Sequence, residues 1–190
     1  MRQKMMENNK PNLTAHAMQA GTAMGLFWIA KFALFPAGLA HPFLFFFFLG
    51  VTLCVPFVGW HLTRNYRDRV CGGVLPPARA WSFAFLMYIY AALLTAMGHY
   101  IYFRFLDHGF IVNTYEQMLD DFFAQAPHVV ASTYQKPMEE AIAAIRTLTP
   151  IQIAIQQLTQ NVFCGAILAL ITLPFVARRN GHGAQTPPNE

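Results

Sequence analysis

The sequence predicts an all-α fold. It is expected to be a polytopic membrane protein with a four-transmembrane-helix bundle and two amphipathic helices in a long outer loop. The first observation is composition, because 55% of the 190 residues are hydrophobic and only 12% are charged, whereas soluble domains carry about 25% charged residues. The second is the stretch from Ala80 to Phe103, which holds no charge and as a helix can cross a hydrocarbon core of about 30 Å. The third is the sign of the loop charges, which alternates along the chain.

Four apolar segments have the length of a transmembrane helix. They are expected at residues 21–40, 42–61, 80–104 and 151–176. His41 and Pro42 are expected to form the turn between the first two segments. Lys31 interrupts the first segment, and Pro56 lies inside the second, where a proline usually produces a kink.

The loop charges predict the orientation. The loop between the second and third segments carries four arginines against one aspartate, whereas the loop at 106–149 carries six acidic residues against two basic ones. Short basic loops stay in the cytoplasm, so the loop at 106–149 is expected on the outer side of the membrane. The single membrane domain, 17–177, then lies between two cytoplasmic tails, 1–16 and 178–190.

The outer loop contains two segments with helical periodicity. Their apolar residues are Ile111, Tyr115, Met118, Leu119 and Phe122 in the first, and Met138, Ile142, Ile145 and Leu148 in the second. Asn113 with Glu116 is expected to cap the first helix, which should stop near Pro127. Pro137 is expected to open the second helix. Both helices are expected to lie against the membrane surface or to cap the outer end of the bundle.

Small residues recur at every fourth position in two segments. Gly21 and Gly25 follow Ala17 in the first segment, and Gly165 precedes Ala169 in the last. Rows of this kind let helix backbones approach closely in lipid. They predict either packing within one bundle or a face for a second copy of the chain.

Polar residues gather in the outer half of the predicted spans. The candidate ligand-binding residues are Lys31, His99, Gln156, Gln160 and Asn161, with Gln157 beside them. A lysine within a span is a functional hypothesis, and the set predicts a hydrated pocket open to the outside. The alternative is that Lys31 extends outward to the membrane surface while the amides form hydrogen bonds between helices.

Other chemistries are not expected. His41, His99 and His108 share the outer end, but no carboxylate-bearing signature accompanies them, so no metal site or cofactor is expected. The three cysteines lie outside the outer loop, so no exported disulfide framework is expected. The basic residues are scattered through short loops, which excludes a nucleic-acid surface. No nucleophile, zincin or nucleotide motif is present, and the chain is not expected to be an enzyme.

Several motifs resemble those of the DUF4199 family. They are Tyr66-Arg67-Asp68, Gly72-Gly73, Phe83-Ala84-Phe85 leading to a span that ends YIYF, and the last segment NVFCGAILALITLPFVARR. The resemblance implies a bacterial four-helix membrane protein of uncharacterised function. It implies no catalytic residues.

Three functional hypotheses follow. The first is a non-enzymatic assembly or interaction partner, which contacts the lipid bilayer and another membrane protein or a second copy of itself through the outer loop. The second is a small transporter or ligand-binding membrane protein that uses the polar pocket around Lys31. The third is a membrane enzyme that acts on lipids.

Overall fold

The computed structural model describes residues 12–177, and within that range the chain is all-helical, without a β-strand. The helices are α2 (Leu13–Ala40), α3 (Pro42–Arg69), α4 (Pro77–Phe105), α5 (Phe110–Gln125), α6 (His128–Arg146) and α7 (Pro150–Val176). Helices α2, α3, α4 and α7 are each long and apolar enough to cross a membrane. The predicted all-α class and its four long apolar helices are confirmed.

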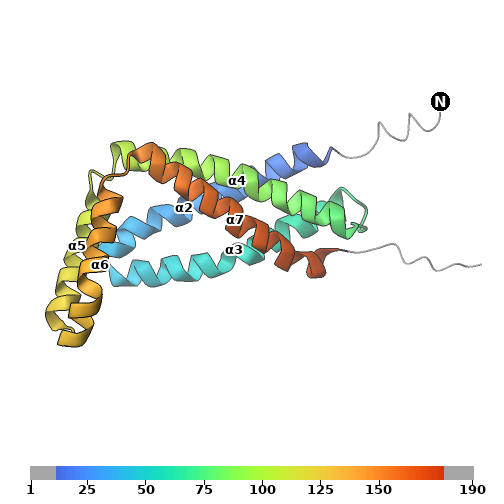
Figure 1. Cartoon of the computed structure of the whole chain (residues 1–190). Coiled ribbons are helices and arrows are strands. Elements are labelled where there is room, and N and C mark those ends of the chain that lie inside the picture. The colour runs from blue at the N-terminus through green and yellow to red at the C-terminus, as the bar shows by residue number, and fades with distance from the viewer. Residues whose placement is uncertain (1–11, 178–190) are drawn as a thin grey trace, which may run out of the picture.

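The four long helices lie side by side, and α5 and α6 form a helical hairpin that crosses one end of them (Figure 1). We call this end the hairpin end, and the opposite end, which carries the α3–α4 connection at 70–76, the turn end. Helix α4 packs mainly against α2 and α7, and α3 packs mainly against α2. Among the 18 most apolar consecutive residues of each helix, 44% are buried in α4 and 11% are buried in α3. Helix α4 is therefore the central helix and α3 the most peripheral.

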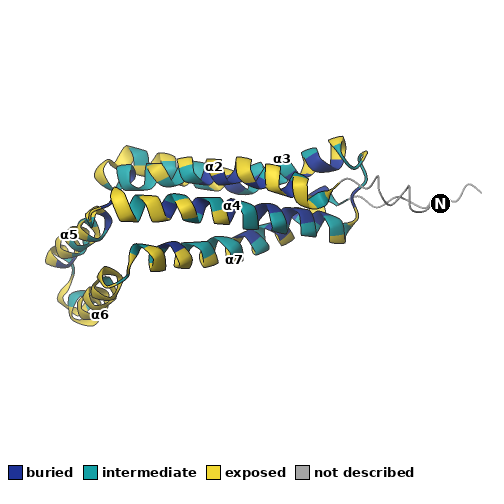
Figure 2. Cartoon of the chain, turned by 90° about the horizontal axis from the view of Figure 1, so that it is seen from above, coloured by how far each residue is buried: buried dark blue, intermediate teal, exposed yellow. Residues whose placement is uncertain are grey.

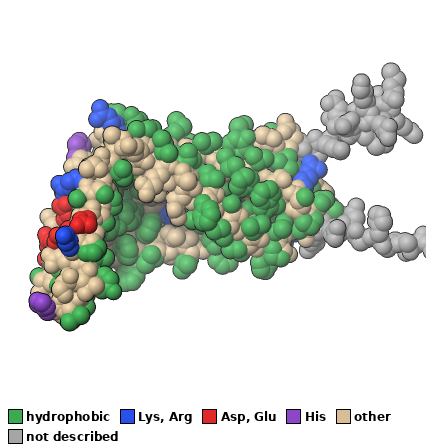
Figure 3. All heavy atoms as spheres, in the orientation of Figure 1, with side chains coloured by type: hydrophobic (Ala, Val, Ile, Leu, Met, Phe, Trp, Pro, Cys, Tyr) green, Lys and Arg blue, Asp and Glu red, His purple; other side chains and the backbone are tan. Residues whose placement is uncertain are grey.

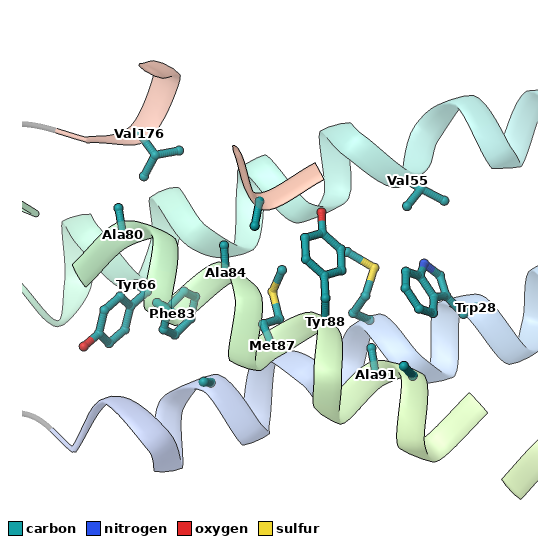
Figure 4. Close-up of a cluster of buried hydrophobic side chains, with 14 of the residues drawn as sticks. Trp28, Val55, Tyr66, Ala80, Phe83, Ala84, Met87, Tyr88, Ala91 and Val176 are labelled. Carbon is teal, nitrogen blue, oxygen red and sulfur yellow. The ribbon is translucent and has the colours of Figure 1, made fainter. Parts of the chain in front are cut away.

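The core follows α4 at helical spacing. Tyr88 and Phe83 are among the largest fully buried side chains, and Phe83 stacks on Tyr66 with ring centroids 4.0 Å apart. Tyr88 stacks on Trp28 of α2 at 5.9 Å. Figure 4 shows these aromatic rings between the ribbons of the long helices. Aromatic side chains of α4 therefore fill the space between α2, α3 and α7.

The outward surface of the long helices is apolar. Phe43 is 80% exposed and Leu53 is 72% exposed, and hydrophobic side chains cover much of the long-helix surface in view (Figure 3). Figure 2 shows the buried residues on the faces that the helices turn toward one another. Monomeric soluble proteins rarely expose apolar patches of more than a few hundred Å². This perimeter is suited to contact with lipid chains.

The helices extend beyond the expected spans. Helix α2 begins at Leu13 instead of residue 21, because the side chain of Asn12 accepts a hydrogen bond from the backbone N–H of Ala15 and caps it. Helix α3 continues past residue 61 to Arg69. The polar residues at these ends are compatible with a helix, so each apolar segment is shorter than the helix that contains it. Of the expected tail at 1–16, residues 1–11 lie outside the described part of the chain. The whole of the expected tail at 178–190 also lies outside it.

The turn at His41 and Pro42 is present, with Pro42 as the first residue of α3. At the other end, Gly72 and Gly73 adopt φ values of 63° and 85°. Glycine reaches this left-handed region without steric cost. The two glycines therefore turn the chain from α3 into α4.

The caps of the hairpin differ from expectation. Asn113 lies inside α5, and the backbone N–H groups of Gly109 and Ile111 instead donate to the carboxylate of Asp107 at 3.1 and 3.2 Å. Asp107 is buried, so it orders the junction between α4 and α5. Pro137 lies within α6, which begins at His128. A proline inside a helix removes one backbone hydrogen bond to the residue four positions earlier. Pro137 and that residue, Thr133, are both exposed, so water can reach the unpaired carbonyl.

Candidate ligand-binding cavity

A cavity of about 200 Å³ lies in the half of the molecule nearer the hairpin. Helices α2, α4 and α7 supply most of its lining, and Phe48 is the lining residue from α3. Its lining consists of Trp28, Lys31, Phe32, Phe35, Phe48, Thr95, His99, Gln157 and Asn161. Of the predicted ligand-binding residues, Lys31, His99 and Asn161 line this cavity. We call it the Lys31 cavity.

Helical spacing places these residues together. Trp28, Lys31 and Phe35 lie on successive turns of α2, because residues three and four apart share a face. Thr95 and His99 are four apart on α4, and Gln157 and Asn161 are four apart on α7. Three rigid helices therefore present their polar groups to one space.

Two buried polar atoms of the cavity lining have no hydrogen-bond partner among the described residues. They are Nε1 of Trp28 and Nδ1 of His99, and both residues are only 5% exposed. An indole N–H can only donate, and leaving a buried polar group unpaired costs about 1–3 kcal/mol. A bound group with acceptor oxygens would satisfy the indole.

Lys31 carries the charge of the cavity. Its Nζ lies 5.7 Å from the ring centroid of Phe48, a cation–π distance. None of the ion pairs found between residues 12 and 177 involves Lys31, and no aspartate or glutamate lines the cavity. The site therefore combines one unneutralised cation with hydrogen-bond donors.

The walls of the cavity are aromatic and fixed. Phe32 packs edge-on against the ring of His99, with centroids 4.2 Å apart. Thr95 donates its hydroxyl to the carbonyl of Ala91 at 2.7 Å, so this hydroxyl is already engaged. An occupant would thus meet both aromatic rings and polar groups in the same cavity lining.

Gln156 and Gln160, which the sequence analysis grouped with Lys31, are exposed and do not line the cavity. Gln156 precedes Gln157 by one residue, which is about 100° around the helix axis. The amide of Gln160 donates to Sγ of Cys164 at 3.5 Å, on the exposed side of α7. The polar stripe of α7 is therefore divided between two faces.

The sequence contained a signal for the correct face. Gly165 and Ala169 pack inward on α7, and counting back four residues at a time from Gly165 reaches Asn161 and Gln157. Trp28 was not predicted as a site residue. It lies three residues beyond Gly25, on the continuation of the small-residue row of α2, and this position could have identified it.

The small residues lie where α4 approaches its neighbours. A Cβ atom at Gly21 would lie 2.6 Å from Cβ of Tyr90 and 2.7 Å from the carbonyl oxygen of Met87. A Cβ atom at Gly25 would lie 3.0 Å from Leu94, and one at Gly165 would lie 2.6 Å from Cβ of Tyr88. All three glycines therefore face α4 within one chain.

Four helices long and apolar enough to span a membrane, with a largely apolar perimeter, define the class as an α-helical membrane protein with four candidate spans. The comparisons with known proteins agree with that class. The chain belongs to the DUF4199 family, described as "Protein of unknown function", whose family model matches residues 19–175. No curated protein and no solved structure shows significant similarity to the chain.

Proposed function

We propose that this protein is a four-helix-bundle membrane protein that binds a small organic monoanion, of the carboxylate class, in the Lys31 cavity. The observation that carries the proposal is the set of donors around one cavity: the unpaired Nε1 of Trp28 and Nζ of Lys31, which is in none of the described ion pairs, beside the amides of Gln157 and Asn161. A carboxylate offers two oxygens that accept from several donors at once.

The charge of the cavity favours a monoanion. One lysine lines it and no acid does, so a single negative charge leaves the occupied site neutral. Charges in a low-dielectric region are costly unless paired, and a dianion such as phosphate would leave one charge without a partner. A neutral ligand would leave the lysine uncompensated.

The size and walls of the cavity favour a small organic body. An engineered apolar cavity of about 150 Å³ binds benzene, and the Lys31 cavity has about 200 Å³. Phe32, Phe35 and Phe48 would contact the apolar part of the ligand. An aromatic or short-chain carboxylic acid matches both features, and benzoate is a suitable probe.

The proposal is tested with the full chain in lipid nanodiscs. Benzoate should raise the thermal midpoint of unfolding and change the fluorescence of the protein, because the indole of Trp28 would contact it. Benzyl alcohol, which has the same ring but no charge, should have little effect, and inorganic phosphate should have none. Equal responses to benzoate and benzyl alcohol would refute recognition of a carboxylate.

We further propose that the hairpin end faces outward. Four arginines (Arg64, Arg67, Arg69 and Arg79) lie at the turn end, whereas five of the seven charged residues of α5 and α6 are acidic. The positive-inside rule then places the turn end in the cytoplasm. The Lys31 cavity would lie in the outer half of the membrane.

The hairpin itself is suited to the membrane surface. It follows directly from the end of α4, and it exposes apolar side chains such as Phe122 on α5 and Val129 on α6. Figure 3 shows charged side chains on the side of the hairpin away from the long helices. The salt bridge between Arg146 and Glu116 ties the two helices together. A role as an assembly partner would use this same apolar surface of the hairpin. We propose instead that lipid covers this surface.

Thiol labelling tests the orientation. In a chain with Cys54 and Cys164 replaced by alanine, a cysteine at exposed Ser132 should react with an impermeant maleimide added from the outer side of the inner membrane. Native Cys71, in the α3–α4 connection, should react only after that membrane is opened. The opposite order of labelling would reverse the orientation.

A further inference from the structure

A second cavity lies at the turn end, between the start of α2 and the end of α3, and nothing above assigns it a role. Its volume is about 250 Å³. Its lining consists of His16, Gln19, Ala20, Ala23, Leu62, Asn65, Tyr66, Arg69, Val70 and Phe83. Polar and apolar side chains are thus mixed in one groove, which we call the Arg69 groove.

Arg69 has no acidic partner within residues 12–177. The nearby carboxylate of Asp68 is already engaged, because it accepts from Nε of Arg67 at 2.7 Å and from Nε of Arg64 at 3.4 Å. Arg67 is buried and also donates to the backbone carbonyl of Val176 at 3.1 Å, which fixes this network to α7. The guanidinium of Arg69 therefore remains available to an external anion.

The groove also offers uncharged hydrogen-bonding groups. His16 lies beside Tyr66, with ring centroids 5.7 Å apart, and Gln19 and Asn65 contribute amides from the two helices. A phosphate diester has oxygen acceptors for all of these donors, and guanidinium groups bind phosphate through two parallel hydrogen bonds. The polar part of the groove therefore fits a phosphate.

The apolar part indicates the source of that phosphate. Ala20, Ala23 and Leu62 lie farther along α2 and α3 toward the middle of the long helices than His16 and Arg69 do. The groove thus has a polar end at the level of lipid head groups and an apolar end directed into the membrane. Basic pockets between transmembrane helices bind the head groups of anionic lipids.

We infer that the Arg69 groove binds the phosphate of an anionic phospholipid, with part of an acyl chain along Ala20 and Ala23. The site is separate from the Lys31 cavity, which lies toward the opposite end of α2. It does not depend on the proposed carboxylate binding.

The test uses the full chain in a neutral detergent, with thermal unfolding and native mass spectrometry as readouts. Phosphatidylglycerol should raise the unfolding midpoint by several degrees and remain bound as one retained lipid. Phosphatidylcholine should do neither, because its choline cation neutralises the phosphate diester and is repelled by Arg69. Glycerol 3-phosphate, which has the phosphate without the chains, should have no effect. Stabilisation by glycerol 3-phosphate equal to that by the lipid would overturn the lipid assignment in favour of a soluble phosphate.

Two variants and one control locate the site. Arg69→Gln should reduce retained phosphatidylglycerol at least fivefold, and Ala20→Leu should do the same by filling the groove without changing any charge. Arg104→Gln removes a cation at the hairpin end, where Arg104 lies over the ring of Phe105, and should retain the lipid. Full retention in Ala20→Leu, or equal loss in Arg104→Gln, would show that lipid binds elsewhere or through overall charge.

Discussion

Replacing Gly21 by alanine is expected to lower the free energy of unfolding by about 1–3 kcal/mol, the usual cost of overpacking a well-packed interior. The new Cβ would lie 2.6 Å from Cβ of Tyr90 and 2.7 Å from the carbonyl oxygen of Met87. The carbonyl oxygen of Met87 is a backbone atom of α4, and Cβ of Tyr90 is bonded directly to that backbone. A change of side-chain rotamer therefore cannot relieve either contact. Helices α2 and α4 must move apart. Unfolding by denaturant in mixed micelles measures the effect.

Gly50 provides the matched control. It also lies inside a long helix, but nothing lies within 4 Å of the Cβ that alanine would add. Gly50→Ala should therefore leave stability unchanged or raise it by about 0.5–1 kcal/mol, the helix propensity that alanine gains over glycine. Equal stability of the two variants would mean that α2 and α4 do not approach as closely as the structure places them.

Replacing Lys31 by methionine is expected to weaken benzoate binding by about 10- to 100-fold, because hydrogen bonds to charged groups contribute about 1.5–3 kcal/mol. The fold should remain intact or become more stable. A lysine near the centre of a span costs about 2.5–3.5 kcal/mol on insertion scales, and the uncharged methionine side chain would remove that cost. Equilibrium dialysis in nanodiscs and thermal unfolding measure the two effects separately.

Two further variants control this experiment. Lys31→Arg keeps the charge and should retain most of the binding. Gln160→Leu changes a polar residue of the same stripe on α7 that lies outside the cavity, and it should bind benzoate as the unmodified protein does. Wild-type affinity in Lys31→Met would show that benzoate partitions into lipid or binds at another site.

The number and approximate position of the long helices could be predicted because hydropathy is a local property. Their ends could not. Leu13 and Arg69 lie in polar segments, where the helix continues until a cap or a glycine stops it. The prediction of the helix caps in the hairpin was wrong for a similar reason. Asn113 has a good capping signature in sequence, but the buried carboxylate of Asp107 reaches the free N–H groups first.

The candidate site was predicted in part. Lys31 stands out because a charge in an apolar segment is unusual, and His99 and Asn161 match its depth. Depth can be counted along a helix, but the rotation of each helix depends on what packs against it. The contact of Gly165 with Tyr88 sets the rotation of α7, and it turns Gln157 inward while Gln160 faces outward. The position of Trp28 could be read from the row of small residues on α2, but its unpaired Nε1 in the lining of the cavity is known only from the structure.

The most direct test of the proposed function is diffraction from a crystal grown in a lipid phase with 4-bromobenzoate, in which anomalous scattering locates the bromine. We expect one bromine peak in the Lys31 cavity, near the rings of Phe35 and Phe48. The carboxylate should lie within hydrogen-bonding distance of Nζ of Lys31 and Nε1 of Trp28. A cavity filled by water or by the protein's own side chains at saturating ligand, with bromine only among the lipids, would contradict the proposal.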